Sequence, residues 1–252
     1  GSVAKVGVVR QGVADLLSFS ITRGDIPLTT VDAAYRVDDN IGYIKVNRFG
    51  QTTMSEFREA MEKLSKVNTL ILDLSNNGGG LLTQAVDMAG YFLPKGTVVV
   101  STEGRALPPV EYKSKGEQEF KGRVIVVVNE SSASGSEVVA GALQDWDRAV
   151  IVGRRSYGKG LVQREIPLGD GSAVHITIAR YHTPSGRVIQ RPYEQGKKAE
   201  YDKAFVERVR SGDADSGSLV RDRLDEYKTM RLGRSGYGGG GITPDVKVAV
   251  DT

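Results

Sequence analysis

Hydrophobic and polar positions along the chain follow two periods in turn, one typical of strands and one typical of helices. Near the start, hydrophobic residues alternate with polar ones over residues 6–10 and 17–23, which predicts a pair of short strands. From residue 41 the pattern predicts a strand (41–46), a helix (55–66) and a second strand (69–74). This β-α-β order indicates the start of a parallel sheet.

The middle of the chain continues the alternation. A glycine-rich turn over residues 75–80 leads into a helical stretch over 81–92, which Pro94 ends. A short strand (97–101) and a polar connection precede the uninterrupted apolar strand 123–128, whose composition is typical of a strand buried on both faces. The next helix has one hydrophobic stripe, formed by Val138, Val139, Ala142, Leu143 and Trp146.

The second half of the chain adds alternating strands, one charged helix and polar connections. In order, we expect a short strand (149–152), two alternating strands (161–166 and 172–181), a helix (197–210), a polar loop (211–218), a glycine run (236–241) and a last alternating stretch (246–250). The whole pattern predicts an α/β fold with a mixed β-sheet core and helices on its faces.

The composition is that of an ordinary globular protein. The 252 residues are 39% hydrophobic and 26% charged, which excludes a globally disordered chain and allows one large domain or one domain with a small appendage. The net charge is only +3 and the two signs are interspersed, which argues against a nucleic-acid partner. Apolar runs such as 124–128 fall far short of the roughly 20 residues that cross a bilayer, so we expect no transmembrane segment.

The chain has no cysteine and only two histidines, His175 and His182. The lack of cysteine excludes thiol nucleophiles, disulfides and thiolate metal sites. Two histidines offer few ligands for zinc, so we expect neither a metal nor a cofactor. A Ser-His-Asp triad would have only these two residues from which to draw its base.

One apparent phosphate-binding motif fails on its context. Residues 153–159 match the first seven positions of G-x-x-x-x-G-K. Gly160 stands where a Ser or Thr hydroxyl should hold Mg²⁺, and residues 161–163 predict a strand instead of the helix that would receive the phosphate. We therefore reject a nucleotide-binding loop.

Four serines crowd the turn between the apolar strand and the next helix, and Ser134 is the candidate nucleophile among them. One interpretation is structural, because Ser134 and Glu137 have the spacing of a capping box. The other is catalytic, because a serine on the sharp bend from strand to helix is exposed and free N–H groups there stabilise an oxyanion. The residues alone leave both interpretations open.

A serine nucleophile needs a base, and Lys159 is the best candidate. His175 lies inside an alternating strand and His182 precedes the turn 183–186, so we expect both to be structural or exposed. Lys159 stands between two glycines, which permit a close approach of the backbone. A lysine in an apolar pocket gives up its proton more readily, because burial disfavours the charged form. The alternative is an ordinary exposed turn lysine.

The glycine-rich turn around residues 77–80 offers unobstructed backbone N–H groups. It follows a predicted strand, as the turn of Ser134 does, and sites in α/β sheets form at the carboxyl ends of the strands. The two turns are therefore placed to face one cavity. A plain left-handed turn would explain the same glycines.

Together, these motifs closely resemble those of the C-terminal processing peptidases, also called tail-specific proteases. The resemblance runs from about residue 3 to residue 250, with the motifs in the family's order. It rests on residues 73–81 (DLSNNGGGL), 132–137 (SASGSE), 141–145 (GALQD), 157–163 (YGKGLVQ), 183–187 (TPSGR) and 240–245 (GGITPD).

The resemblance implies a Ser/Lys dyad in which Ser134 is the nucleophile and Lys159 the general base, with Gln163 at the position whose amide orients the lysine. The residues implied to form the oxyanion hole are Gly79, Gly80 and Gly135. The chain departs from the family where Ser75 replaces the usual Arg and where Gly135 replaces the commoner Ala. Neither change removes a catalytic group.

The resemblance also implies a ClpP/crotonase-like peptidase core over residues 26–252 and a partial PDZ-like β remnant over residues 1–25. Substrates would be proteins or peptides that are cut near an apolar C-terminus and bound as an added β-strand. A further partner would be an adaptor protein or a second copy of the chain. The setting would be the periplasm or cell envelope.

Two other functions fit the same residues. A peptide-binding module would have this fold without turnover. An acyl-CoA enzyme would use the backbone oxyanion hole to stabilise an enolate, would bind coenzyme A, and would have no need of Ser134.

Overall fold

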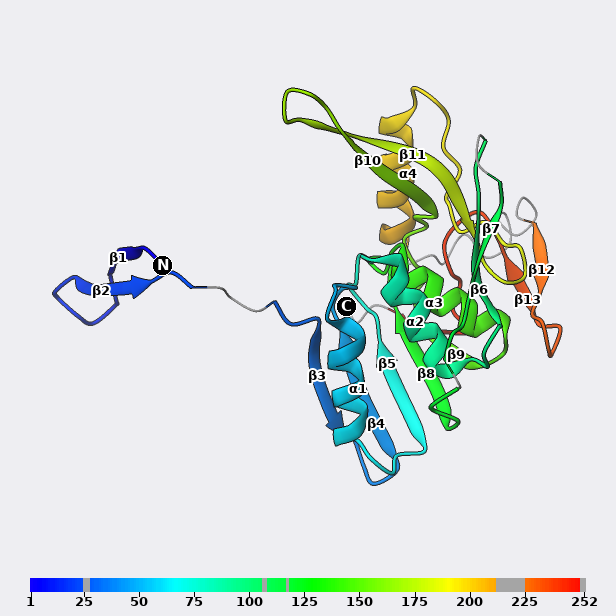
Figure 1. The fold of residues 1–252 in the computed structure, drawn as a ribbon, viewed down its shortest axis with the longest axis horizontal. Helices are drawn as coiled ribbons and strands as arrows, with labels where there is room; N and C mark the ends of the chain where they lie inside the picture. The colour runs from blue at the N-terminus through cyan, green and yellow to red at the C-terminus, as the bar shows by residue number, and fades with distance from the viewer. Residues whose placement is uncertain (25–27, 106–107, 117, 212–224, 250–252) are drawn as a thin grey trace.

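The computed structural model describes residues 1–24, 28–105, 108–116, 118–211 and 225–249. Its main body consists of a six-stranded sheet, a four-stranded sheet and the helices that pack against them (Figure 1). The predicted α/β fold with a mixed sheet core is thereby confirmed.

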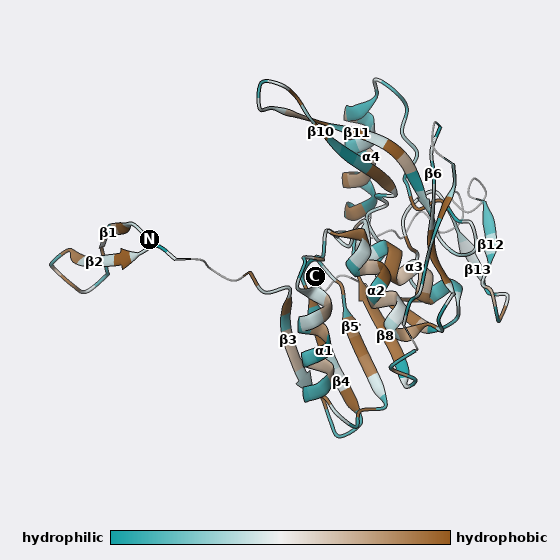
Figure 2. Cartoon of the chain, in the orientation of Figure 1, coloured by the Kyte–Doolittle hydropathy of each residue, from teal (hydrophilic) through white to brown (hydrophobic). Residues whose placement is uncertain are grey.

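The six-stranded sheet has the order β14-β9-β8-β5-β4-β3. Its strands are β3 (Val31–Arg36), β4 (Ile41–Val46), β5 (Thr69–Asp73), β8 (Arg123–Val128), β9 (Ala149–Gly153) and β14 (Val246–Lys247). Neighbours pair in parallel, except that β3 runs antiparallel to β4. Strands at the centre of a parallel sheet are buried on both faces, and the hydrophobic colouring of β5 and β8 in Figure 2 meets that requirement.

α1 (Thr53–Lys63) packs against β3 and β4, α3 (Gly135–Asp145) packs against β9, and α2 (Leu82–Phe92) packs against α1 and α3. α3 contacts β9 and also β6 (Val98–Glu103) of the other sheet, and all of its residues are buried. Core side chains such as Leu72 and Val126 have no exposed surface. Burial of one such side chain contributes roughly 1.5–3 kcal/mol, so the core fixes α3 firmly in place.

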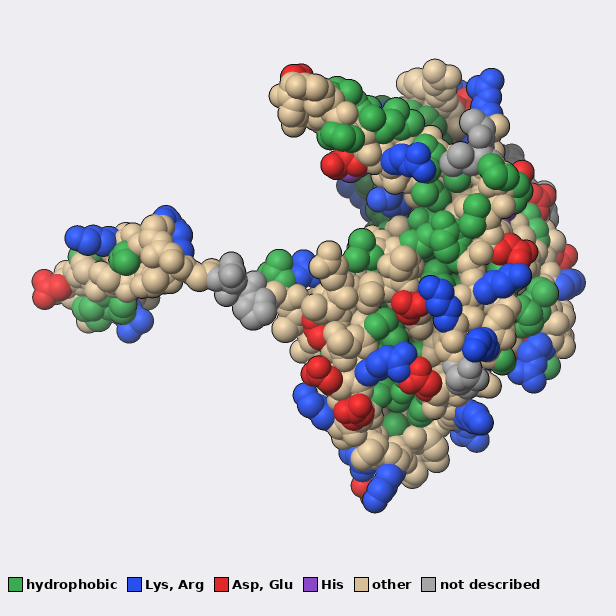
Figure 3. Space-filling view, in the orientation of Figure 1, with side chains coloured by type: hydrophobic (Ala, Val, Ile, Leu, Met, Phe, Trp, Pro, Cys, Tyr) green, Lys and Arg blue, Asp and Glu red, His purple; other side chains and the backbone are tan. Residues whose placement is uncertain are grey.

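The four-stranded antiparallel sheet has the order β10-β11-β6-β7. Its other strands are β7 (Val110–Lys113), β10 (Leu161–Pro167) and β11 (Ala173–His182). β10 and β11 form a hairpin that projects from the body, and α4 (Lys198–Arg210) lies beside it (Figure 1). The face of the molecule beneath this hairpin is concave (Figure 3). A small ribbon is formed by β12 (Glu226–Lys228) and β13 (Ser235–Tyr237).

The N-terminal hairpin consists of β1 (Val3–Val8) and β2 (Leu17–Thr22), which pair in antiparallel fashion (Figure 1). The prediction placed its first strand at 6–10, three residues too late, because Gly12 with its φ of +83° belongs to a turn that begins earlier. None of residues 1–24 is buried. The PDZ-like origin of this hairpin stays a prediction.

Several peripheral strands were missed by the sequence pattern. β3 and β7 are edge strands, so they need few apolar residues, and the connection predicted as purely polar contains β7. The ribbon β12–β13 was missed for the same reason, because all of its residues are exposed or half-buried. The predicted strand at 246–250 is shorter, since β14 ends at Lys247 and residue 250 lies outside the described residues. Most of the predicted loop 211–218 also lies outside them.

The length and composition of the helices bear on whether the chain spans a membrane. In the described ranges, no helix is long and apolar enough to cross a bilayer.

Candidate active site

Three turns meet at one edge of the six-stranded sheet. We name them the glycine turn (74–80, after β5), the serine turn (129–134, after β8) and the lysine turn (154–160, after β9). β5, β8 and β9 are neighbours and run parallel, so their carboxyl ends lie side by side. This arrangement places the three predicted motifs in one region, at the carboxyl ends of the strands, where sites in α/β sheets form.

The serine turn is fastened to the glycine turn by short hydrogen bonds. Ser132 Oγ donates to Leu74 O at 2.8 Å, and Ser136 Oγ donates to Asn77 O at 2.9 Å. The backbone N–H of Ala133 donates to the same Asn77 carbonyl oxygen at 2.9 Å. Ser132, Ser136 and Asn77 have no exposed surface, so these bonds are shielded from water and hold the two turns as one unit.

Ser134 has a backbone conformation that is rare for a residue with a side chain. Its φ is +54° and its ψ is −111° at the residue that precedes α3. Such backbone strain costs of order 1–3 kcal/mol and persists only where the surroundings enforce it. The conformation puts Ser134 on the sharp bend expected of a nucleophile and leaves it half-buried, between the core and the solvent.

Gly79 provides the closest approach between the two turns. A Cβ atom at Gly79 would lie 2.8 Å from Ala133 O, from Gly135 N and from Ser134 Cβ. The φ of Gly79 is +97°, which also favours glycine. Only glycine therefore allows the glycine turn to lie directly against the backbone of the nucleophile.

The backbone N–H groups near Ser134 differ in their availability. Gly135 is the first residue of α3, and its N–H has no acceptor among the described residues. The N–H of Gly79 donates to Asn77 Oδ1 at 2.8 Å, whereas the N–H of Gly80 has no acceptor in the described part of the chain. Of the two glycines of this turn that were predicted to form an oxyanion hole, Gly80 is therefore the one whose backbone N–H has no acceptor among the described residues.

Glu137 joins the serine turn to the lysine turn. Its Oε2 accepts the N–H of Ser134 at 2.9 Å and that of Lys159 at 2.8 Å, and its Oε1 accepts Ser156 Oγ at 2.5 Å and the N–H of Gly158 at 2.6 Å. Burial raises the pKa of Glu137, although these four hydrogen bonds act in the opposite direction. The capping-box interpretation covers only the first of these contacts.

The lysine turn places Lys159 near the nucleophile without joining the two side chains. The N–H of Tyr157 donates to Ser132 O at 2.9 Å, so this turn also touches the serine turn. Lys159 is half-buried, and its Nζ has no hydrogen-bond partner among the described residues. The side chains of Ser134 and Lys159 are not hydrogen-bonded to each other in this structure.

Gln163 lies on β10, just after a register shift in its pairing with β11. Its side chain is exposed and makes no hydrogen bond with Lys159. It lines a cavity of about 820 Å³ together with Tyr157 of the lysine turn, Leu161 just after that turn, and Tyr201 of α4. The cavity thus opens beside the lysine turn, between the β10–β11 hairpin and α4.

Comparison with known proteins decides the family. The sequence model of Peptidase family S41 matches residues 40–202, more than half of the chain. The chain belongs to peptidase family S41. It is 42% identical to the carboxy-terminal-processing protease of Bartonella bacilliformis over 198 residues, which cover 75% of this chain and 45% of that protein.

Other relatives agree with this membership. The carboxy-terminal processing protease CtpA of Bacillus subtilis is 34% identical over 76% of this chain and 41% of its own length. Among solved structures, a photosystem II D1 C-terminal processing protease superposes with a TM-score of 0.62 at 26% identity, covering 98% of this chain and 56% of that one. The chain spans less than half the length of these two curated relatives.

Within this S41 chain, neither histidine supplies a base to Ser134. His175 Nε2 lies 2.8 Å from Glu165 Oε2 on the exposed hairpin, and His182 Nδ1 lies 3.3 Å from Gly186 O. Neither ring hydrogen-bonds to the serine turn. The structure also agrees with the rejection of a phosphate-binding loop at residues 153–159. The segment after Gly160 is the strand β10 and not a helix.

Lys45 lies beside the glycine turn, and sequence reasoning missed it. Its Nζ donates to Ser75 O at 2.9 Å and to Ser75 Oγ at 3.0 Å, and it lies 3.2 Å from Asp73 Oδ2. Lys45 thus brings a positive charge to the turn where the resemblance leads one to expect an Arg at Ser75. The parallel register of β4 and β5, which pairs Lys45 with Asp73, is the signal that could have found it.

Asp73 completes this polar cluster at the end of β5. Tyr43 donates its hydroxyl to Asp73 Oδ2 at 2.6 Å, and the N–H of Ser75 donates to Asp73 Oδ1 at 2.7 Å. Burial alone would raise the pKa of Asp73, but the hydrogen bonds from Ser75 and Tyr43 and the charge of Lys45 hold it below its usual value. The carboxylate of Asp73 therefore holds the start of the glycine turn in place.

No metal-binding group stands out in this part of the molecule. Across the described ranges, no three His, Asp or Glu side chains gather in a way that could hold a metal ion.

Proposed function

We propose that this chain is a serine endopeptidase in which Ser134 is the nucleophile and Lys159 is the general base. The observation that carries the proposal is the position of Glu137 between the two residues. Its Oε2 accepts the backbone N–H of both, so their nitrogens lie within about 6 Å of each other. A lysine that starts this close can reach the serine hydroxyl through its flexible side chain.

The acylation step uses groups that the site already brings together. Neutral Lys159 Nζ takes the proton of Ser134 Oγ while Oγ forms a bond to the scissile carbonyl carbon. The carbonyl oxygen becomes an oxyanion. When the C–N bond of the substrate breaks, the protonated lysine returns that proton to the leaving amine, which leaves an ester on Ser134.

The oxyanion would be held by backbone N–H groups. The N–H of Gly135 and one from Gly79 or Gly80 are the proposed donors, and the bond between Gly79 and Asn77 Oδ1 favours Gly80. Water then attacks the ester with Lys159 as base, which releases the acid product and restores the serine. Gln163 would orient the lysine once substrate fills the adjoining cavity.

The substrates would be proteins that end in an apolar C-terminus. This specificity rests on the resemblance to tail-specific proteases and on the printed names of the relatives, which describe processing at a carboxy terminus. The peptidase unit would comprise residues 26–252, with residues 1–25 as a partial PDZ-like remnant. The resemblance also suggests a periplasmic or envelope location and an adaptor or second copy as partner, which cell fractionation and pull-down would test.

A second candidate function is a peptide-binding module without turnover. It is favoured by one observation, the lack of a hydrogen bond between Ser134 Oγ and Lys159 Nζ. Catalytic hydrogen bonds are often long in the absence of substrate, so the peptidase remains the better-supported function.

The test is cleavage of an unfolded protein that ends in apolar residues, followed by gel and mass spectrometry. The native chain should produce defined fragments, and Ser134→Ala and Lys159→Ala should each abolish them. Lys63→Ala, an exposed lysine on α1, is the matched control and should cleave normally. Cleavage by Ser134→Ala would contradict the assigned nucleophile, and binding without cleavage by every form would favour the peptide-binding module.

A further inference from the structure

The guanidinium of Arg191 is enclosed by three aromatic rings. Its Cζ lies 4.0 Å from the ring centre of Tyr201, 4.7 Å from that of Tyr157 and 4.8 Å from that of Phe205. Tyr201 and Phe205 belong to α4, whereas Tyr157 belongs to the lysine turn. Arg191 therefore joins α4 to the turn that carries Lys159.

This arginine is held by ring faces more than by hydrogen bonds. Arg191 is only 7% exposed, and its Nε and Nη2 atoms are buried without any hydrogen-bond partner. A cation positioned over aromatic faces is attracted by their electron density, and the attraction strengthens when water is excluded. The position of Arg191 thus depends directly on the rings of α4.

Arg191 also contacts the backbone of the lysine turn. The backbone N–H of Arg191 donates to Gly158 O at 3.0 Å. A Cβ atom at Gly158 would lie 2.3 Å from Arg191 Cγ, so the side chain lies directly on the residue that precedes Lys159. Gln190 acts on the other side of the lysine, because its Oε1 accepts the N–H of Gly160 at 3.0 Å and its Nε2 donates to Tyr201 OH at 3.1 Å.

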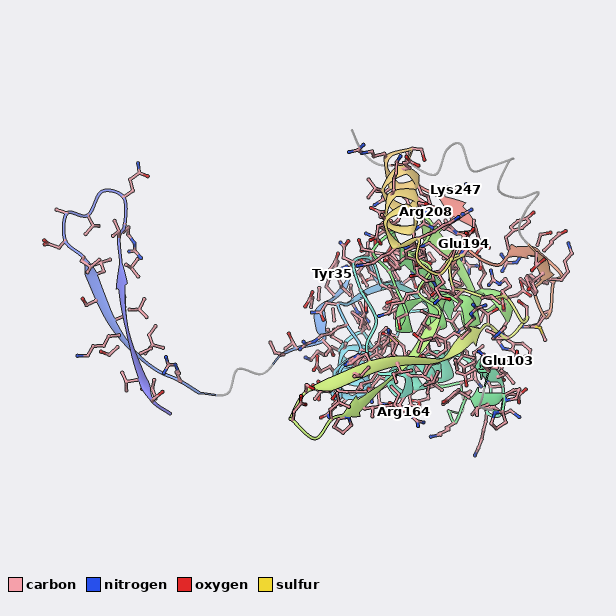
Figure 4. All side chains as sticks on the ribbon, turned by 90° about the horizontal axis from the view of Figure 1, so that it is seen from above. Tyr35, Glu103, Arg164, Glu194, Arg208 and Lys247 are labelled. Atoms are coloured by element: carbon pink, nitrogen blue, oxygen red, sulfur yellow. The ribbon has the colours of Figure 1, made fainter. Side chains whose placement is uncertain are left out.

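α4 makes two more contacts with the same turn. The rings of Phe205 and Tyr157 pack against each other at a tilt of 53°, with their centres 4.7 Å apart. Arg208, labelled on α4 in Figure 4, donates from Nη2 to Ser156 O at 2.9 Å. Residues 156, 157, 158 and 160 are therefore all held from the α4 side, while Glu137 holds Gly158 and Lys159 from the α3 side.

We infer that α4 and Arg191 form a clamp that positions Lys159 for proton transfer from Ser134. The inference rests on the proposed peptidase function, and it assigns Arg191 and Phe205 as positioning residues. Phe205 and Arg208 lie beyond residues 40–202, the segment that matches the family model. The alignment of the dyad in this chain thus depends on a helix, α4, of which the family match reaches only residues 198–202.

A clamp of this kind acts on the rate of the chemical step. A displacement of about 1 Å in a catalytic group can lower the rate by about 100-fold. Loosening the lysine turn should therefore reduce kcat while leaving KM, which reflects substrate contacts, largely unchanged.

The activity test compares Phe205→Ala with Val206→Ala and Phe205→Tyr. Val206 is the next residue on α4 and is 47% exposed, so its truncation is a matched control. We expect Phe205→Ala to lower kcat about 10- to 100-fold with KM unchanged. Phe205→Tyr keeps the ring, and it and the control should behave like the native protein. An Arg191→Lys variant, which keeps the charge but loses the flat stacking surface, should give an intermediate kcat.

Amide hydrogen exchange tests the clamp without any need for activity. In Phe205→Ala, the amides of Gly158 and Lys159 should exchange at least about 10-fold faster, whereas those of α3 should keep their native rates. Unchanged exchange in the lysine turn, or an equal increase in α3 that marks general destabilisation, would overturn the inference. If the native chain cleaves no substrate, the proposed function fails, but the exchange experiment still decides whether α4 holds the turn.

Discussion

The serine turn and the lysine turn are held in place by different means. The serine turn is fixed mainly by short, buried hydrogen bonds from Ser132 and Ser136 to the adjacent glycine turn, with one further bond from the N–H of Ser134 to Glu137 Oε2. The lysine turn is held by long side chains, Glu137 on one side and Arg191 with α4 on the other. The turn of the proposed nucleophile is therefore set mainly by hydroxyl-to-backbone hydrogen bonds, and the turn of the proposed base mainly by long side chains.

This difference explains which turn carries strain. Ser134 keeps its positive φ because Gly79, Asn77 and the start of α3 leave its backbone no alternative. In the proposed mechanism Lys159 needs reach more than rigidity, since its long side chain would move between the serine hydroxyl and the leaving amine. A turn held at its flanking residues, with a free Nζ, suits that task.

Gly79→Ala should have the largest effect, because it breaks the serine turn itself. The new Cβ would lie 2.8 Å from Ala133 O and Gly135 N at a φ of +97°. We expect activity to fall about 10³-fold, comparable to the loss of an oxyanion donor, as measured by kcat/KM on an unfolded protein substrate. Gly78→Ala is the matched control, since a Cβ there meets no atom within 4 Å, and it should cost little. Equal effects at the two positions would contradict the close packing inferred at Gly79.

Glu137→Gln should weaken both turns together. The new glutamine has an amide nitrogen in place of one carboxylate oxygen, and this nitrogen would face two of the four donors that now point at Glu137. Those buried N–H or O–H groups would lose their acceptor. We expect a loss of about 1–3 kcal/mol in the free energy of unfolding and about 100-fold in kcat. Denaturant unfolding and steady-state kinetics measure the two effects.

The control for Glu137 is Glu62→Gln, an exposed carboxylate on α1. It should leave both quantities unchanged. Native kcat in Glu137→Gln would mean that the bridge between the two turns is only a helix cap.

Gly160→Ala should affect the lysine turn alone. A Cβ at Gly160 would lie 2.6 Å from Gln190 N, so the segment that packs behind the turn must shift. We expect about a 10-fold fall in kcat, equivalent to roughly 1.4 kcal/mol in the activation free energy. The amide hydrogen-exchange rates of the serine turn should stay unchanged. Gly169→Ala at the hairpin tip, where a Cβ meets nothing, should be neutral. A disturbed serine turn in Gly160→Ala would show that the two turns are not held separately.

Asp73→Asn should have the smallest effect, and the effect should depend on pH. The pKa of Asp73 is lowered in the folded state, so its carboxylate adds stability above the unfolded value of about 3.9 and loses that contribution as the pH falls through the folded value. The variant should therefore be about 1 kcal/mol less stable at pH 7, with the gap closing below about pH 4. Thermal unfolding at a series of pH values measures this gap, with the exposed Asp39→Asn as control. A gap that does not change with pH would refute the role of the charge.

The elements that the sequence predicts well are those whose burial leaves a periodic signal. The apolar run of β8 and the glycine-punctuated turn after β5 could be identified directly, and so could the turn that carries Ser134. The edge strands β3 and β7 could not, because one side of an edge strand needs no hydrophobic partner.

The contacts that link the turns were harder to foresee. Glu137 has the spacing of a helix cap, and nothing local reveals that three of its four donors come from the lysine turn. The packing of Arg191 against α4 joins residues from three separate segments, so it becomes visible only in the folded chain. Pattern reasoning identified the candidate residues, and tertiary structure was needed to show how their turns are held.

The most direct test of the central claim is covalent labelling by a fluorophosphonate, a reagent that reacts with activated serines, followed by peptide mass spectrometry. The account predicts one adduct per chain, located on Ser134, and at least about 100-fold slower labelling in Lys159→Ala, because the serine then lacks its base. An adduct on another serine, or native labelling rates in Lys159→Ala, would contradict the account.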